Sequence, residues 1–181
     1  MNTHELQVQY WNQFSRLKRD ALYISFYHEK VERIERRLNI FTALASAGAM
    51  TAWAAKNDLA AVWSVIILAS QLLTAVRPHL PYRSQLKALG TLSSDLEALA
   101  LVAETDWLKI ARASLEDEEM HKRTMTLKRK ALDAQERSFK GASLPRDQTL
   151  EERAENAATD YMNHYVLQSE GTENGQTAQE A

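Results

Sequence analysis

Residues 38–55 (LNIFTALASAGAMTAWAA) and residues 59–76 (LAAVWSVIILASQLLTAV) are two apolar runs separated by the polar triplet Lys56-Asn57-Asp58. Neither run contains a charged residue over its eighteen positions. At about 1.5 Å rise per residue, each run forms a helix roughly 27 Å long, close to the roughly 30 Å hydrocarbon core of a bilayer. The pattern predicts a transmembrane helical hairpin over residues 38–76.

The flanking residues favour a membrane over the alternative, a buried hairpin inside a soluble helical bundle. Helices that are apolar on every side occur in large soluble cores, and the Ala-rich first run gains little from lipid insertion. Basic side chains stand at both outer ends of the hairpin, namely Arg33, Arg36, Arg37, Arg77 and Arg83. Because Lys and Arg are retained on the cytoplasmic side, both termini are expected in the cytoplasm, with the turn outside.

Composition limits the other classes of function. The chain has 181 residues, a formal net charge of −2 and no Cys. Near-neutral charge disfavours a nucleic-acid partner, which calls for a basic surface, and the lack of Cys excludes disulfides and thiolate metal sites. Residues 141–181 carry two basic against eight acidic residues, so the C-terminal end is acidic.

The rest of the chain predicts an all-α fold, since it has only five Gly, three Pro and no alternating apolar strands. We expect a long amphipathic N-terminal helix over residues 1–37, whose apolar stripe continues to Leu38. A long cytoplasmic helix is expected over residues 77–140, with Leu89, Leu92, Leu96, Leu99 and Ala103 at heptad-like spacing. A capping box of Thr149 and Glu152 predicts a short helix over residues 145–167, followed by a disordered tail over residues 168–181. The stripe residues of the N-terminal helix are Tyr10, Phe14, Leu17, Ala21, Ile24 and Val31; those of the short helix are Leu150, Ala154, Ala157, Tyr161 and Tyr165.

Motifs for catalysis and cofactor binding are missing. The sequence has no GxGxxG, Walker A, HExxH or GxSxG pattern. One Glu118-x-x-His121 pair occurs, but metal sites in helical bundles use two such pairs and further Glu residues. We therefore predict no metal, no cofactor and no enzymatic activity.

Two features of the hairpin suggest association between helices. The first run is small-faced, with Ala45, Gly48 and Ala49 at spacings that let helix backbones approach closely, either within one chain or between chains. The second run holds Gln71, flanked by Ser64 and Thr74, and a buried amide in lipid needs a hydrogen-bonding partner. Gln71, Ser64 and Thr74 are the candidate pore-lining residues. Two helices cannot enclose a channel, so a pore would need several copies.

The plan of residues 11–107 resembles the SLATT family of two-transmembrane proteins linked to bacterial nucleotide-signalling conflict systems. The resemblance lies in residues 20–27 (DALYISFY), Arg33, Arg36-Arg37, the hairpin, and Arg83 with the leucine stripe from Leu86 to Leu99. It implies an effector in the bacterial inner membrane that oligomerises and permeabilises the membrane in defence against phage. No part of the chain resembles a nucleotide-sensing domain, so the trigger is expected either from a nucleotide-signalling or sensor partner protein or from the cytoplasmic helices, with the charged and acidic part from Glu116 onward as the control region.

Three hypotheses of function follow. The first is this pore-forming membrane effector, with the lipid bilayer and further copies of the chain as partners. The second is a membrane-anchored helical scaffold, and the third a soluble all-α interaction module without pore activity.

Overall fold

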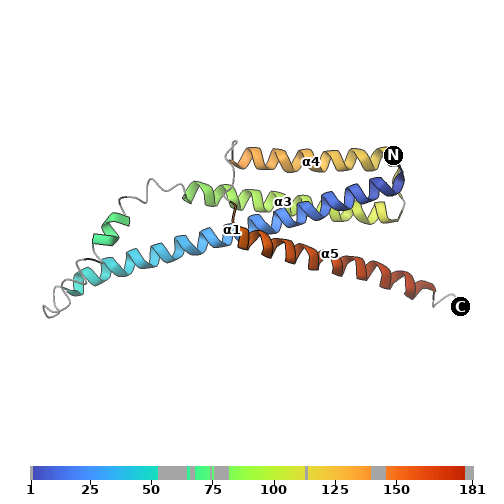
Figure 1. Ribbon diagram of the computed structural model, residues 1–181. Coiled ribbons are helices and arrows are strands. Elements are labelled where there is room, and N and C mark those ends of the chain that lie inside the picture. The colour runs from blue at the N-terminus through green and yellow to red at the C-terminus, as the bar shows by residue number, and fades with distance from the viewer. Residues whose placement is uncertain are drawn as a thin grey trace. The chain divides into compact units, whose positions relative to one another are not determined.

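The fold is all-α, as predicted. The computed structural model describes residues 2–52, 65, 68–73, 75, 82–112, 114–139 and 146–177, and within these no strand occurs. Four helices are labelled in Figure 1: α1 (Thr3–Ala52), α3 (Tyr82–Ala111), α4 (Asp117–Phe139) and α5 (Gln148–Thr177).

The chain divides into two compact units. The bundle unit comprises Met1–Tyr27 and Ala88–Ala181, and the middle unit comprises His28–Lys87. Helix α1 contributes its first half to the bundle unit and its second half to the middle unit. The border between units therefore precedes the expected end of the N-terminal segment at residue 37, and no helix break occurs there.

The core of the bundle unit follows the stripes predicted for α1 and α3. Tyr10 and Phe14 are fully buried, as are Leu92 and Leu96. Ring contacts join the first half of α1 to the end of α3, with ring centroids of Trp11 and Trp107 4.7 Å apart. The two helices run antiparallel within this unit (Figure 1). Of the predicted positions, Leu99 and Leu38 are only half-buried; the others listed for these two stripes are buried.

The single helix expected over residues 77–140 was a wrong prediction, because two helices occupy this range. Helix α3 ends at Ala111, where the Ser114 hydroxyl donates to the Lys109 carbonyl oxygen at 2.7 Å. Helix α4 then begins with three acidic residues, which the positive end of the helix dipole favours. Arg123 pairs with Asp106 and Arg137 lies 3.6 Å from Asp95, so α4 folds back antiparallel along α3.

Helix α5 also differs from its prediction. It begins at Gln148 and continues to Thr177, so it is longer than the predicted 145–167 and includes most of the tail expected to be disordered. Its N-cap is Asp147, whose Oδ1 accepts a hydrogen bond from the Leu150 N–H at 3.3 Å. The predicted capping box of Thr149 and Glu152 is therefore wrong.

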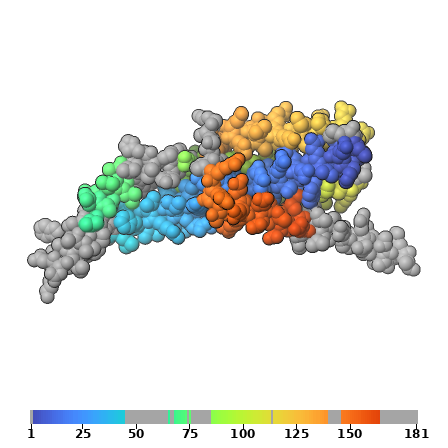
Figure 2. Space-filling model, viewed as in Figure 1, coloured from blue at the N-terminus to red at the C-terminus, as the bar shows by residue number. Residues whose placement is uncertain are grey.

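Helix α5 packs against α1 and runs antiparallel to it. The Arg153 guanidinium lies 4.2 Å from the centre of the Phe26 ring, and Lys18 Nζ lies 4.0 Å from the centre of the Tyr161 ring. The Tyr161 hydroxyl donates to Glu104 on α3 at 2.7 Å. In the bundle unit, α4 and α5 thus flank the pair formed by α1 and α3 (Figures 1 and 2).

Candidate functional site

The middle unit carries large apolar side chains on its surface. Six of them have exposed fractions between 43% and 67%, and we call them the apolar set: Ile40, Phe41, Leu44, Val65, Leu68 and Leu72. The first three lie on one side of α1, because positions three and four apart share a helix face. The last three, Val65, Leu68 and Leu72, are each helical and follow one another at spacings of three and four. Each half of the set falls in one of the two apolar runs predicted to cross a membrane.

The hydroxyl of Thr42, which lies on the other side of α1 from Ile40 and Leu44, is satisfied inside the helix. Thr42 Oγ1 donates to the Leu38 carbonyl oxygen at 2.8 Å. A hydroxyl bonded to the carbonyl four residues earlier leaves no donor that needs water. This position is therefore compatible with an apolar medium on the outside.

The arginines that precede the apolar set on α1 are partly neutralised by neighbouring carboxylates. Arg33 lies 3.6 Å from Glu29 and Arg36 lies 3.0 Å from Glu32, both one helical turn apart. Arg37 is exposed. Exposed ion pairs of this kind contribute little to stability, so their guanidinium groups can exchange carboxylate for another anion at small cost.

Among the predicted pore and oligomer residues, the structure describes only Gln71 in full. Gln71 is helical and exposed, between half-buried Ser70 and exposed Leu72. The positions of Ala45, Gly48 and Ala49 lie in the continuous helix α1. Ser64, Thr74, Arg77 and the turn at residues 56–58 lie outside the described residues, and Arg83 lies in the first turn of α3.

No described helix is at once long enough and apolar enough to cross a membrane. Within the same residues, no group of three or more His, Cys, Asp or Glu side chains is placed to hold a metal ion.

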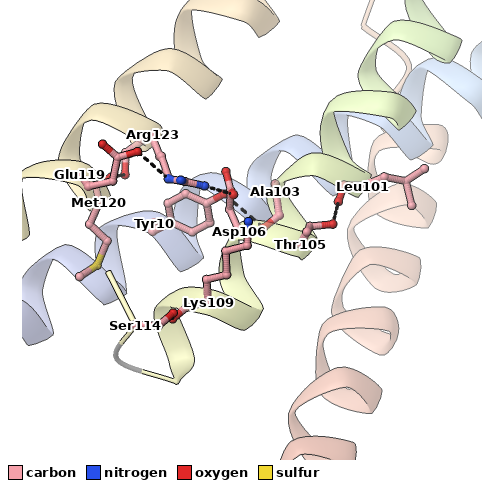
Figure 3. A network of polar contacts seen from close by, with 11 residues as sticks. Tyr10, Leu101, Ala103, Thr105, Asp106, Lys109, Ser114, Glu119, Met120 and Arg123 are labelled. Carbon is pink, nitrogen blue, oxygen red and sulfur yellow. Dashed lines mark hydrogen bonds and ion pairs between the residues drawn. The ribbon is translucent and has the colours of Figure 1, made fainter. Parts of the chain in front are cut away.

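A polar network in the bundle unit was not predicted from the sequence (Figure 3). The buried Tyr10 hydroxyl donates to the Ala103 carbonyl oxygen at 3.2 Å. Nearby, the Arg123 guanidinium joins Asp106 on α3 to Glu119 on α4, with 3.0 Å between its Nε and Glu119 Oε1. In the sequence, this network is indicated only by Glu119 and Arg123, which stand four positions apart. The ion pair of Arg123 with Asp106 forms because α4 folds back along α3.

Burial and charge shift the pKa values in this network. Burial raises the pKa of Tyr10 well above its ordinary value, the Asp106 carboxylate raises it further, and Arg123 opposes them. Partial burial lowers the pKa of Arg123, but the Asp106 and Glu119 carboxylates outweigh it and raise the pKa overall. The network thus keeps Tyr10 neutral and Arg123 charged, and its role is to join α1, α3 and α4.

Comparisons of the chain with protein-family models, with curated proteins and with solved structures found no match.

Proposed function

We propose that the middle unit inserts into a lipid bilayer and that the chain is a membrane effector that oligomerises and permeabilises a bacterial inner membrane. The observation that carries the proposal is the apolar set on the surface of this unit. An exposed apolar helix face, such as that of Ile40, Phe41 and Leu44 on α1, marks a site of membrane or protein contact.

The free energy available from the apolar set is comparable to the free energy of unfolding of a small protein. Fully burying a Val, Leu, Ile or Phe side chain stabilises by about 1.5–3 kcal/mol, so the roughly half that remains exposed here contributes about 1 kcal/mol per side chain. Six such side chains supply on the order of 5–10 kcal/mol on transfer to lipid. The satisfied hydroxyl of Thr42 removes one cost of that transfer.

Charge supports an orientation with both termini in the cytoplasm. Arg33, Arg36 and Arg37 lie just before the apolar set on α1, and Arg77 and Arg83 follow the second run. Arginines near the bilayer interact with anionic headgroups and are held on the cytoplasmic side. The exposed pairs of Arg33 and Arg36 with glutamates would then be exchanged for lipid phosphates.

Permeabilisation requires several copies, since one hairpin cannot surround a channel. Gln71 is the candidate liner that the structure describes, and it stands exposed beside Leu72. In lipid its amide would find a partner across a subunit contact or in a water-filled pore. A signal from a sensor or nucleotide-signalling protein would trigger assembly, as the resemblance to the SLATT family implies.

A membrane-anchored scaffold is the second candidate, and one observation favours it. The bundle unit has its own buried core, and its helix α3 leaves Leu101, Val102 and Leu108 exposed. Such a surface suits a protein partner. In this case the middle unit would only tether the bundle to the membrane.

Membrane fractionation with matched variants tests the membrane step. The full chain is expected to pellet with membranes after a carbonate wash. The double variant Leu44→Glu with Leu72→Glu should move largely to the supernatant, because each charge at the bilayer core costs several kcal/mol. Leu132→Glu is the control, since Leu132 is exposed to a similar degree on α4 of the bundle unit. Equal pelleting of the double variant and the unsubstituted chain would contradict membrane insertion.

A membrane-potential dye separates the effector from the scaffold. Expression of the full chain in bacteria should depolarise the cells under the first proposal and leave the potential unchanged under the second. Gln71→Leu should remove the depolarisation while the variant still pellets with membranes. Depolarisation by Gln71→Leu as strong as by the unsubstituted chain would exclude Gln71 from the pore.

A further inference from the structure

Helix α4 has one side buried in the bundle unit and one side that points outward. The buried side consists of Met120, Thr124, Leu127 and Ala134. On the opposite side, four exposed side chains follow one another at spacings of three, four and three, so they share one face of the helix. We call these four the α4 outer face: Lys122, Met125, Arg129 and Leu132. Because α4 lies on the outside of the bundle unit, this face is open to a partner (Figure 1).

The middle of α4 is cationic. Residues 120–132 (MHKRTMTLKRKAL) contain five Lys or Arg and no Asp or Glu. Arg123 is neutralised by Asp106 and Glu119. Within the described residues the other four cations form no ion pair: Lys122, Lys128, Arg129 and Lys130. Their charge is therefore available to an anionic partner.

The outward carboxylates of α4 lie at the two ends of this cationic stretch. Glu118 precedes it, Asp133 and Glu136 follow it, and all three are exposed. Between these ends, the side chains of the α4 outer face are either positively charged or apolar. The apolar ones, Met125 and Leu132, are 50% and 60% exposed.

The flank of the bundle unit formed by α5 has the opposite charge. Four exposed carboxylates lie on the first half of this helix: Glu151, Glu152, Glu155 and Asp160. Arg153, the one basic residue of α5, lies over the Phe26 ring. Where the structure describes the side chains of α5, no large apolar side chain is exposed. An anionic surface therefore attracts the α4 flank and repels the α5 flank.

We propose that the α4 outer face binds the anionic surface of a lipid bilayer, with α4 lying along the membrane. Lys122 and Arg129 then contact headgroup phosphates, and Met125 and Leu132 enter the boundary between headgroups and acyl chains. The half-buried Lys128 borders the face, and its long side chain reaches the same headgroups. Clusters of Lys and Arg on amphipathic helices bind anionic lipid in this way. The proposal rests on the proposed function for the identity of the bilayer, the bacterial inner membrane, and the contact itself does not require insertion of the middle unit.

The apolar side chains select lipid over other anionic partners. A nucleic-acid backbone or the acidic α5 flank of a second copy would pair with Lys122 and Arg129, but it would leave Met125 and Leu132 against charges or water. A bilayer offers phosphates and acyl chains at adjacent depths, so it satisfies both kinds of side chain.

Vesicle binding with matched variants tests the charged part of the face. The chain carrying Leu44→Glu and Leu72→Glu is the parent, so that insertion of the middle unit does not contribute. It should bind vesicles of phosphatidylcholine with phosphatidylglycerol, and bind much less to phosphatidylcholine alone. Adding Lys122→Gln with Arg129→Gln should weaken binding to the anionic vesicles about 25-fold, because each cation near such a surface contributes a factor of about five.

The control changes the net charge equally on the other flank. Asn156→Glu with Thr159→Glu also makes the chain more negative by two charges, at exposed positions of α5, and should leave vesicle binding nearly unchanged. Circular dichroism checks that both variants are folded. Equal binding by the parent and the Lys122→Gln, Arg129→Gln variant would overturn the proposal. An equal loss in the α5 control would overturn it too, since net charge alone would then explain the binding.

A second pair of substitutions tests the apolar part. Met125→Ser with Leu132→Ser should weaken binding to the anionic vesicles about tenfold, because about half of each side chain is available for transfer to lipid. Binding to the vesicles that this variant retains in full would contradict a lipid contact. Binding of the parent to a DNA duplex or to itself as tight as to the vesicles would assign the face to those partners instead and overturn the proposal.

This contact and the insertion of the middle unit fail in different experiments. A carbonate wash strips proteins bound only at the membrane surface, so Lys122→Gln with Arg129→Gln in the otherwise unsubstituted chain should leave carbonate-resistant pelleting unchanged. Pelleting with no effect of these substitutions on vesicle binding would reject the surface contact and keep insertion. Charge-dependent vesicle binding without carbonate-resistant pelleting would keep the contact and reject insertion.

Discussion

Tyr10 shows how a single residue joins the two central helices of the bundle unit. Its ring is fully buried, and its hydroxyl donates to the Ala103 carbonyl oxygen of α3. Its ring centroid lies 6.5 Å from that of Trp107, so the residue contributes both apolar packing and a directed bond. A buried hydroxyl without an acceptor would instead destabilise the fold.

Replacing Tyr10 by Phe should lower the free energy of unfolding by about 1 kcal/mol, the usual net value of one hydrogen bond. The pKa of Tyr10 is raised in the folded chain, so its contribution is complete below the unfolded pKa of about 10 and is lost as the pH rises above it. Urea unfolding at neutral and alkaline pH measures both effects. The Phe variant should lose less stability than the unsubstituted chain between these pH values; equal losses would contradict the pKa shift.

The pair of Asp106 and Arg123 is predicted to be worth more than an ordinary surface pair. Its side chains are 15% and 28% exposed, so water screens the charges only in part. We expect a coupling free energy of about 1–2 kcal/mol between Asp106→Ala and Arg123→Ala in a double-mutant cycle. The exposed pair of Arg36 and Glu32 is the comparison and should give less than about 1 kcal/mol. Equal coupling free energies for the two pairs would show that burial does not strengthen the pair of Asp106 and Arg123.

At the scale of elements, the start of α5 depends on one side chain. Asp147 caps the helix through Leu150 N–H and is itself held by Tyr23, whose hydroxyl accepts from the Asp147 N–H at 3.1 Å. The cap thereby joins the beginning of α5 to α1. Thr149, predicted from the sequence as the capping residue, lies inside the helix and is exposed.

Asp147→Ala should therefore destabilise the chain by about 1 kcal/mol, the usual cost of losing an N-cap. Thr149→Ala should change the free energy of unfolding by less than about 0.5 kcal/mol, as for other exposed positions. Thermal melts followed by circular dichroism distinguish the two. A larger effect of Thr149→Ala would support the capping box predicted from the sequence.

At the scale of the whole molecule, the two units are expected to respond separately to substitution. Leu96→Ala removes a fully buried side chain of the bundle unit and should cost about 2–5 kcal/mol of stability. It leaves the apolar set untouched, so pelleting with membranes should persist at temperatures below the melt. Leu72→Glu should reduce pelleting and leave the melting temperature of the bundle unchanged. If each substitution changed both the melting temperature and the pelleting with membranes, the division into two units would be contradicted.

The periodicity of the sequence was enough to predict the all-α fold and the buried sides of α1 and α3, because apolar spacing is a local property. The apolar spacing predicted the wrong buried residues where a contact with another helix determines which side chain is buried. In α5 the predicted Ala157 and Tyr161 are half-buried, and Ala158 and Met162 are buried instead. The Tyr161 hydroxyl donates a hydrogen bond to Glu104 on α3, and no residue spacing in the sequence predicts that contact.

For the candidate site, the sequence by itself identified the two apolar runs and their arginine flanks, since length and the absence of charge can be seen without folding. The tertiary structure decided which of their side chains stand on the surface: Ile40 and Leu44 are exposed, while Leu38 is half-buried. It also decided that α3 turns back into α4 and that Tyr10, Asp106 and Arg123 meet. These features join residues far apart in the chain, and long-range packing, which local pattern does not contain, brings them together.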